Sequence, residues 1–212
     1  MDDAAQARAY AEADFAEPNA RFVALYEEFV GPLPAGAAVL DLGCGPGDIS
    51  LQLAAAHPGI EVHGLDGSAA MLHFGIAALA ATPALHDRVH FIEGLVPDAE
   101  LPRSRYEALV SNSLLHHLHE PDALWRMIVA RGHPGAPVLV MDLMRPASMA
   151  AAGALVEAHA AGEPEVLRRD FYNSLLAAFE PAEVRRQLEA AGLGHFTVRP
   201  VSDRHLVIYG RL

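Results

Sequence analysis

Three glycines stand at alternate positions in a short loop early in the chain. Gly43, Gly45 and Gly47 follow the apolar residues 39–42, which predict a buried parallel strand. Glycine has no Cβ and adopts positive φ, so this loop allows a ligand to lie close to the backbone. Residues 49–56 are apolar without Gly or Pro and predict a helix that begins as the loop ends. Strand, glycine loop and helix form the first unit of a nucleotide-binding type of α/β fold, whose ligand lies at the carboxyl end of the strand.

The spacing of this loop separates two kinds of ligand. A dinucleotide fingerprint, G-x-G-x-x-G, needs a glycine where this chain has Asp48, and a pyrophosphate disfavours a neighbouring carboxylate. The sequence instead resembles the first motif of the class I S-adenosylmethionine (SAM)-dependent methyltransferases, D/E-x-G-x-G-x-G, through Asp41 and the three glycines. SAM has no phosphate and carries sulfonium and ammonium cations, so nearby acidic residues are tolerated or useful. The resemblance implies that the loop, Cys44 included, holds the methionine part and the ribose, while Asp41 favours the ammonium directly or through water.

A second acidic residue stands about 20 residues beyond the loop, at the end of the next predicted strand, residues 60–65. A carboxylate at this place accepts both ribose hydroxyls of an adenosine, and the resemblance gives this role to Asp66. Its neighbours Gly67 and Met71 join the expected cofactor site, although Met71 is equally suited to core packing. Ser68 is predicted to cap the helix that follows.

The adenine end of the expected site departs from the family pattern. After the predicted strand 88–93 and Gly94, the family usually has an acidic residue that receives the adenine amino group, but this chain has Leu95. Asp98 in the following loop is either an adenine contact or a solvated carboxylate. Backbone N–H groups around Leu95 and Val96 are the other candidates for reading the adenine edge.

The residues before the first predicted strand form an N-terminal addition to the core. Residues 3–29 are expected to be helical, with a break or restart at Pro18-Asn19. In many methyltransferases of this type such a segment packs over the SAM pocket as a lid. The resemblance therefore makes Tyr10 and Phe22 candidate lid residues, and plain packing of either aromatic on the sheet is the alternative.

Two adjacent histidines follow the fourth predicted strand, residues 106–112. The segment 111–118 resembles the S-x-x-x-L-H-H-L pattern of the family, and Asn112 ends the strand beside the place of the transferred methyl group. The chain lacks the prolines and aromatic residue of the motif found in enzymes that methylate nucleic-acid amino groups. His116 and His117 are either a general base or acceptor-orienting group, or structural residues. Together with His119 they lack Cys or carboxylate partners at ligand spacing, so no metal is predicted.

An insertion between the fifth predicted strand, residues 137–143, and the last helix reads as two helices separated by residues 162–164. In the family that the chain resembles, small-molecule methyltransferases have a substrate cap at this place. Arginines suit a substrate carboxylate, and a solvated helix face is the alternative for each residue. The candidate substrate contacts are Arg145, Arg168, Arg169, Tyr172 and Asn173.

The resemblance covers about residues 37–212 and implies an α/β fold. This is a three-layer α/β/α sandwich whose seven-stranded, mostly parallel sheet has the order 3-2-1-4-5-7-6, with strand 7 antiparallel. One domain would contain an N-terminal helical lid (1–35), a SAM-binding core (36–145), a helical cap insertion (146–180) and a C-terminal helix and β-hairpin (181–212). The hairpin of residues 196–209 is the departure from a dinucleotide-binding fold, so it disfavours an NAD-dependent oxidoreductase.

Composition restricts the partners of this 212-residue chain. Its formal net charge is −12, so its long-range field repels polyanions, and no nucleic-acid partner is expected. No apolar run reaches transmembrane length, and one cysteine cannot form an internal disulfide, so a cytoplasmic protein without membrane contact is expected. All 15 basic residues are arginines, which we interpret as the mutational bias of a GC-rich bacterial genome.

The function that these features favour is methyl transfer from SAM to a small molecule by a monomer or homodimer. The sequence leaves O-, N-, C- and S-methylation open. The alternative is a SAM- or nucleoside-binding protein, or a partner subunit, that keeps the fold without the chemistry. Methylation of a macromolecule is disfavoured by the acidity and by the absence of an appended RNA-binding domain.

Overall fold

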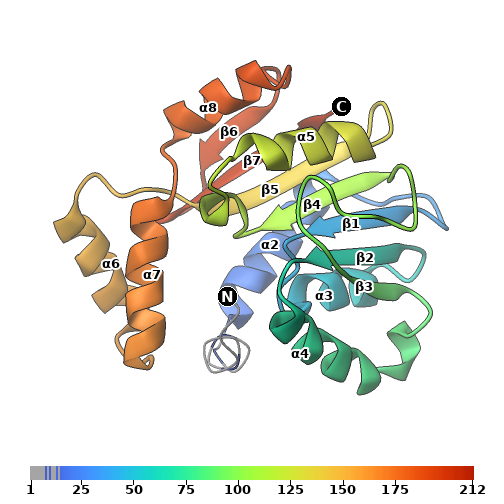
Figure 1. Ribbon diagram of the computed structural model, residues 1–212, viewed down its shortest axis with the longest axis horizontal. Helices are drawn as coiled ribbons and strands as arrows, with labels where there is room; N and C mark the ends of the chain where they lie inside the picture. Colours follow the sequence, from blue (N-terminus) through green and yellow to red (C-terminus); the bar gives the residue numbers. More distant parts are fainter. Residues whose placement is uncertain (1–7, 9, 11–12, 14) are drawn as a thin grey trace.

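A single mixed sheet forms the centre of the protein in a computed structural model that describes residues 8, 10, 13 and 15–212 (Figure 1). Its strands are β1 (Ala38–Leu42), β2 (Glu61–Asp66), β3 (Val89–Glu93), β4 (Ala108–Asn112), β5 (Pro137–Leu143), β6 (Thr197–Pro200) and β7 (His205–Arg211). Their order is β3-β2-β1-β4-β5-β7-β6. β7 runs antiparallel to β5 and β6, and the other neighbouring pairs are parallel. The predicted order and the antiparallel strand are confirmed.

Helices cover both faces of this sheet. They are α2 (Ala16–Phe29), α3 (Asp48–Ala56), α4 (Ala69–Ala80), α5 (Asp122–Arg131), α6 (Met149–Ala160), α7 (Glu165–Ala177) and α8 (Pro181–Ala190), with short 3-10 turns η1 (Pro83–Leu85) and η2 (Leu115–His117). One hydrophobic cluster joins α5 and α8 to the sheet, and a second joins α2 and α3 to it. The result is the predicted three-layer sandwich.

The interior strands β1 and β5 are buried and apolar, but each contains an acidic residue near its carboxyl end. Every residue of β1 and β5 is buried, as expected for strands covered on both faces. Each of these apolar strands contains one carboxylate near its carboxyl end, Asp41 in β1 and Asp142 in β5, and each is 1% exposed. Buried charges of this kind need partners, so they mark the edge of the sheet where polar chemistry is concentrated.

The predicted break or restart at Pro18-Asn19 is found within two residues, because α2 begins at Ala16 after non-helical Phe15 and both residues lie in its first turn. A proline is tolerated there, since the first turn leaves its N–H groups without intrahelical partners. Asn19 is buried and its side chain hydrogen-bonds to Asp48, which ties α2 to the start of α3. Of the predicted lid, residues 1–7, 9, 11, 12 and 14 lie outside the described residues.

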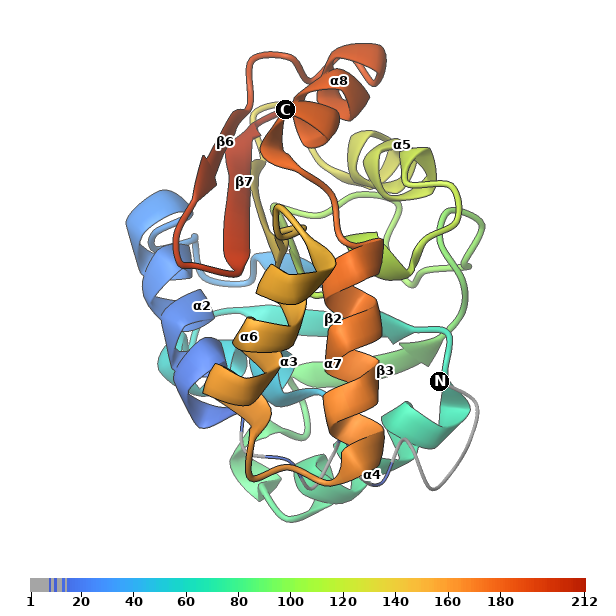
Figure 2. The ribbon, with the colours of Figure 1, turned by 90° about the vertical axis from the view of Figure 1, so that its left-hand side faces the viewer.

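Helices α6 and α7 form the two-helix insertion predicted before the last helix. Figures 1 and 2 show them at the side of the molecule where β4 and β5 end, with α7 nearer to the sheet. A third hydrophobic cluster packs α6 against α7, and α7 also contacts η2. Within the described residues, no helix has the length and apolar character needed to cross a membrane.

Candidate functional site

The glycine loop after β1 is a tight turn fastened to the end of β2. Gly43, Gly45 and Gly47 have φ values of 72°, 54° and 83°, so all three adopt the left-handed conformation that glycine tolerates. The N–H groups of Gly43 and Cys44 donate to the carbonyl of Leu65 over 2.8 and 3.0 Å. These bonds hold the loop against the carboxyl end of the neighbouring strand.

The three glycines meet different surroundings. A Cβ at Gly43 would lie 2.8 Å from Leu114, and one at Gly47 would lie 2.3 Å from the Phe91 ring. A Cβ at Gly45 would meet only the Met71 methyl group, at 3.4 Å, among the described residues within 4 Å. Packing therefore requires glycine at the outer two positions, and Gly45 is the member of the loop that leaves its near side open to a ligand.

Asp66 at the end of β2 is oriented by two backbone donors. Its Oδ2 accepts from the Gly45 N–H and its Oδ1 accepts from the Ser68 N–H, each over 2.8 Å. A carboxylate oxygen has a second lone pair, so both oxygens keep a site for a ligand hydroxyl. Ser68 caps α4 by accepting from the Met71 N–H, as predicted. Met71 itself is buried, with its methyl group directed at the glycine loop.

Asp41 lies beneath the same loop with one carboxyl oxygen lacking a partner. Its Oδ2 accepts from the Ser50 hydroxyl over 2.7 Å, while its Oδ1 has no hydrogen-bond partner in the described part of the chain. Burial raises the pKa of Asp41 to about 7; the Asp66 charge adds to this rise and the Ser50 hydrogen bond opposes it. A buried carboxyl oxygen without a donor favours the binding of a cation or an N–H group. The Oδ1 of Asn112, at the end of β4, is likewise buried without a partner among these residues.

The residues after β3 provide an apolar surface near Asp66. Leu95 is 73% exposed, and its side chain covers Gly67 so closely that a Cβ there would lie 2.4 Å from Leu95 Cδ2. Val96 is half-buried beside it, whereas Asp98 is exposed in a turn whose N–H donates to the Leu95 carbonyl. The adenine contact offered for Asp98 stays a prediction, and the exposed Leu95 side chain offers an apolar contact for an aromatic ring.

A buried histidine–carboxylate pair joins the ends of β4 and β5. His116 Nδ1 lies 2.6 Å from Asp142 Oδ1, and the Asp142 carboxylate also accepts from the N–H groups of Leu115 and Leu143. His116 is 8% exposed, and its Nε2 has no hydrogen-bond partner among the described residues. His117 is exposed, with its ring 4.1 Å from that of His116. The sequence analysis did not predict a role for Asp142. The available indication was an acidic residue next to the end of an otherwise apolar strand.

Tyr10 connects the N-terminal segment to these carboxylates. Burial, followed by the charges of Asp48, Asp66 and Asp142, raises the pKa of Tyr10 to about 12. These carboxylates belong to α3, β2 and β5, so Tyr10 lies over the place where the ends of these elements converge. Phe22, the other candidate lid residue, is instead fully buried in the cluster between α2 and the sheet.

Comparison with known sequences agrees with this geometry. The family described as "Methyltransferase domain" matches residues 39–135, which contain the glycine loop, Asp66 and His116. Within this region the chain is therefore similar to a methyltransferase domain, and its sheet has the strand order that the resemblance implied. Over 129 residues the chain is 29% identical to an uncharacterised methyltransferase of Mycobacterium tuberculosis. That alignment covers 60% of each protein, so the chain spans less than two thirds of the length of this curated relative.

Solved structures share the fold of this chain. A SAM-dependent methyltransferase from Aquifex aeolicus superposes with a TM-score of 0.69 at 17% identity, covering 99% of this chain and 98% of that one. Phosphoethanolamine N-methyltransferase 2 of Haemonchus contortus, in complex with SAM, gives 0.65 at 19% identity, covering 86% of this chain and 38% of that one. At these identities the likeness is one of fold.

The Aquifex and Haemonchus proteins are a SAM-dependent methyltransferase and a SAM complex, and the residues of this chain fit the same cofactor. The unpartnered oxygen of buried Asp41 suits a cationic ligand, and the open side of Gly45 admits one close to the backbone. Asp66 would receive the ribose hydroxyls and Leu95 the adenine ring. The roles of Asp41 and Asp66 are those that the resemblance implied, whereas for Leu95 the sequence had offered its backbone N–H group rather than its side chain.

Most of the predicted substrate residues in and next to the cap insertion already have partners within the protein. Arg145 pairs with Glu183 over 2.6 Å, and Arg168 pairs with Glu157, which links α7 to α6. Arg169 is exposed, with Asp170 at 4.0 Å. Tyr172 packs partly against the α6–α7 cluster, and Asn173 is exposed. The substrate contacts stay a prediction. The ion pairs give Arg168 a structural role between the cap helices and Arg145 one between the end of β5 and α8.

Proposed function

We propose that this protein transfers the methyl group of SAM to a small-molecule acceptor. The observation that carries the proposal is the unpartnered, buried Oδ1 of Asp41 beneath the glycine loop, next to an Asp66 oriented by two N–H groups. A fold without a cationic ligand gains nothing from such a carboxyl group, because burial without a partner costs free energy. A ligand with an ammonium group and a ribose satisfies both carboxylates.

SAM supplies an activated methyl group on a cationic sulfur, and the residues of this chain align its acceptor. The acceleration of such a transfer depends mainly on alignment and on exclusion of water. His116 adds a proton acceptor where the acceptor atom must lose a proton. Its Nδ1 is held by Asp142, which leaves Nε2 as the nitrogen that takes the proton.

The small size of the acceptor is supported by the cap and by the charge of the chain. Helices α6 and α7 stand at the carboxyl ends of β4 and β5, and α7 contacts the turn that bears His116. A covered site favours a compact acceptor. The net charge of −12 disfavours a nucleic-acid acceptor. The arginines proposed to bind a substrate carboxylate give less support, because Arg145 and Arg168 already pair with Glu183 and Glu157.

Calorimetric titration with SAM and with S-adenosylhomocysteine tests the cofactor. We expect micromolar binding by the wild type, weakened at least tenfold in Asp66→Ala and less in Asp66→Asn, which keeps the side-chain shape. Asp122→Ala, a carboxylate removal on the exposed start of α5, is the matched control and should bind as the wild type does. Folded wild-type protein that binds neither compound would remove the proposal.

A panel of small acceptors then tests the reaction through the formation of S-adenosylhomocysteine. Turnover with any of them supports a methyltransferase. Cofactor binding without turnover across O-, N-, C- and S-acceptors would favour the alternative, a binding protein or partner subunit that keeps the fold.

A further inference from the structure

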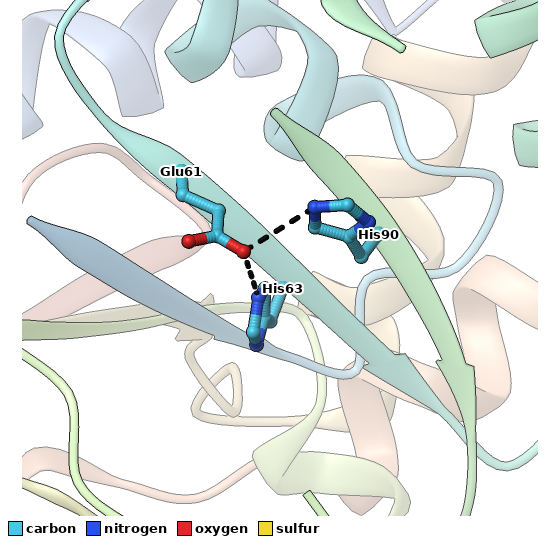
Figure 3. Close-up of side chains that lie close together, drawn as sticks. All are labelled: Glu61, His63 and His90. Carbon is cyan, nitrogen blue, oxygen red and sulfur yellow. Dashed lines mark hydrogen bonds and ion pairs between the residues drawn. The ribbon is translucent and has the colours of Figure 1, made fainter. Parts of the chain in front are cut away.

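Three potential metal ligands lie together at the opposite end of the sheet from the glycine loop. Glu61 and His63 alternate along the start of β2, so their side chains share one face of the sheet, and His90 of β3 is the register partner of His63. Figure 3 shows both imidazoles directed at the same carboxylate oxygen. These residues are unrelated to His116, His117 and His119, the histidines that the sequence analysis considered.

The distances suit a small divalent ion. Glu61 Oε1 lies 2.7 Å from His63 Nε2 and 3.3 Å from His90 Nε2, and the three ligand atoms lie within 4.8 Å of one another. Zinc binds imidazole nitrogen and carboxylate oxygen at about 2.0–2.2 Å in a tetrahedron, whose ligand atoms are then roughly 3.3 Å apart. The spacing is therefore close to that of a tetrahedral face, and small side-chain movements complete it.

Tyr106 and Arg103 hydrogen-bond to the potential ligands and fix their orientation. His63 is 2% exposed, and its Nδ1 lies 2.8 Å from the hydroxyl of Tyr106, so the ring is held with Nε2 toward Glu61. Arg103 donates to the other oxygen of the Glu61 carboxylate, which leaves Oε1 facing the imidazoles. Metal-ligating histidines usually have their second nitrogen fixed in this manner.

Access to the cluster comes from the solvent side. The side chain of His90 is 44% exposed and that of Glu61 is 26% exposed, while His63 closes the inner side. A metal ion can therefore enter past His90 and keep a water molecule as its fourth ligand.

We propose that Glu61, His63 and His90 form a binding site for a zinc-like divalent transition-metal ion that joins β2 to the edge strand β3. β2 has six residues, so Glu61 lies about 17 Å from Asp66 at its other end. The ion is therefore structural and takes no part at the cofactor site. Its binding stabilises the folded chain because an unfolded chain does not hold the three ligands together.

Metal titration of full-length protein, freed of any affinity tag and treated with a chelator, tests the site. We expect one tight Zn²⁺ per chain, and Co²⁺ as a probe should give the intense visible absorption of tetrahedral coordination. Glu61→Gln and His90→Ala should each weaken Zn²⁺ binding at least about tenfold. Loss of a residue that only orients a ligand already costs about that much, and loss of a ligand should cost more. Zn²⁺ at 100 times its Kd should raise the wild-type Tm by about 5 °C or more.

His133→Ala is the matched control, because His133 is an exposed histidine that also lies near a glutamate, Glu107 at 3.5 Å. It should keep the wild-type Zn²⁺ affinity and Tm shift. SAM titration should give the same affinity in Glu61→Gln as in the wild type. If Glu61→Gln and His90→Ala, both folded, bind Zn²⁺ as tightly as His133→Ala does, the proposal is overturned.

Discussion

The buried carboxyl group of Asp41 makes the stability of the ligand-free protein depend on pH. Its pKa of about 7 in the fold exceeds the ordinary value of 3.8, so between these values the folded chain holds a proton that the unfolded chain has lost. Stability therefore falls as the pH rises from about 4 to about 7, by about 1.4 kcal/mol per pH unit for one proton. We expect Asp41→Asn, whose amide oxygen still accepts from Ser50, to remove this contribution.

Urea unfolding of the wild type and Asp41→Asn at pH 5 and pH 7 measures the effect. The difference between the two proteins isolates Asp41 from all the other titratable groups, which the two proteins share. The variant should gain stability relative to the wild type as the pH rises. Parallel losses in both proteins would show that Asp41 is ionised throughout.

His116 provides a second prediction at this scale. If its Nε2 takes a proton from the acceptor, His116→Asn should lower kcat/KM by about 100-fold or more while SAM affinity stays the same. His119→Asn, an exposed histidine two residues beyond the pair, is the matched control and should keep wild-type rates. Production of S-adenosylhomocysteine measures both. Equal rates in the two variants would assign His116 a purely structural role.

At the scale of elements, two glycines predict opposite changes in stability. Gly47→Ala places a Cβ at φ 83° and 2.3 Å from the Phe91 ring, so we expect a loss of about 2–3 kcal/mol. Gly153→Ala lies inside α6 with no described atom within 4 Å of the added Cβ, so helix propensity should give a gain of about 0.5–1 kcal/mol. Urea unfolding compares the two variants with the wild type. A destabilised Gly153→Ala would contradict the expected fit of α6.

Local patterns were sufficient to predict most elements but not their mutual contacts. Apolar runs and glycine positions located the strands and the cap helices, because burial and backbone conformation act over neighbouring residues. The His116–Asp142 pair joins residues 26 positions apart, and the Glu61–His90 pair depends on strand register, so neither follows from spacing. The ion pairs of Arg145 and Arg168 were missed for the same reason, since their partners Glu183 and Glu157 lie on other helices.

At the scale of the whole molecule, the negative net charge predicts that the protein does not bind nucleic acids tightly. The net charge of −12 opposes the approach of a polyanion, so we expect the chain to release few counterions from RNA or DNA and to bind them weakly at most. Fluorescence anisotropy with a labelled RNA and a labelled DNA duplex at 50 mM salt should show no saturable binding tighter than about 100 µM. Salt-sensitive binding below that concentration would reopen a nucleic-acid acceptor.

The place of β7 in the sheet has a consequence for the nascent chain. β7 lies between β5 and β6 although it follows both in sequence. While a ribosome is still extending the chain, β5 forms the border of a half-built sheet, and all seven of its residues are ones that the finished fold buries. An apolar border of this kind pairs readily with strands of other molecules. The interval between the emergence of β5 and that of β7 is therefore when newly made copies depend most on chaperones.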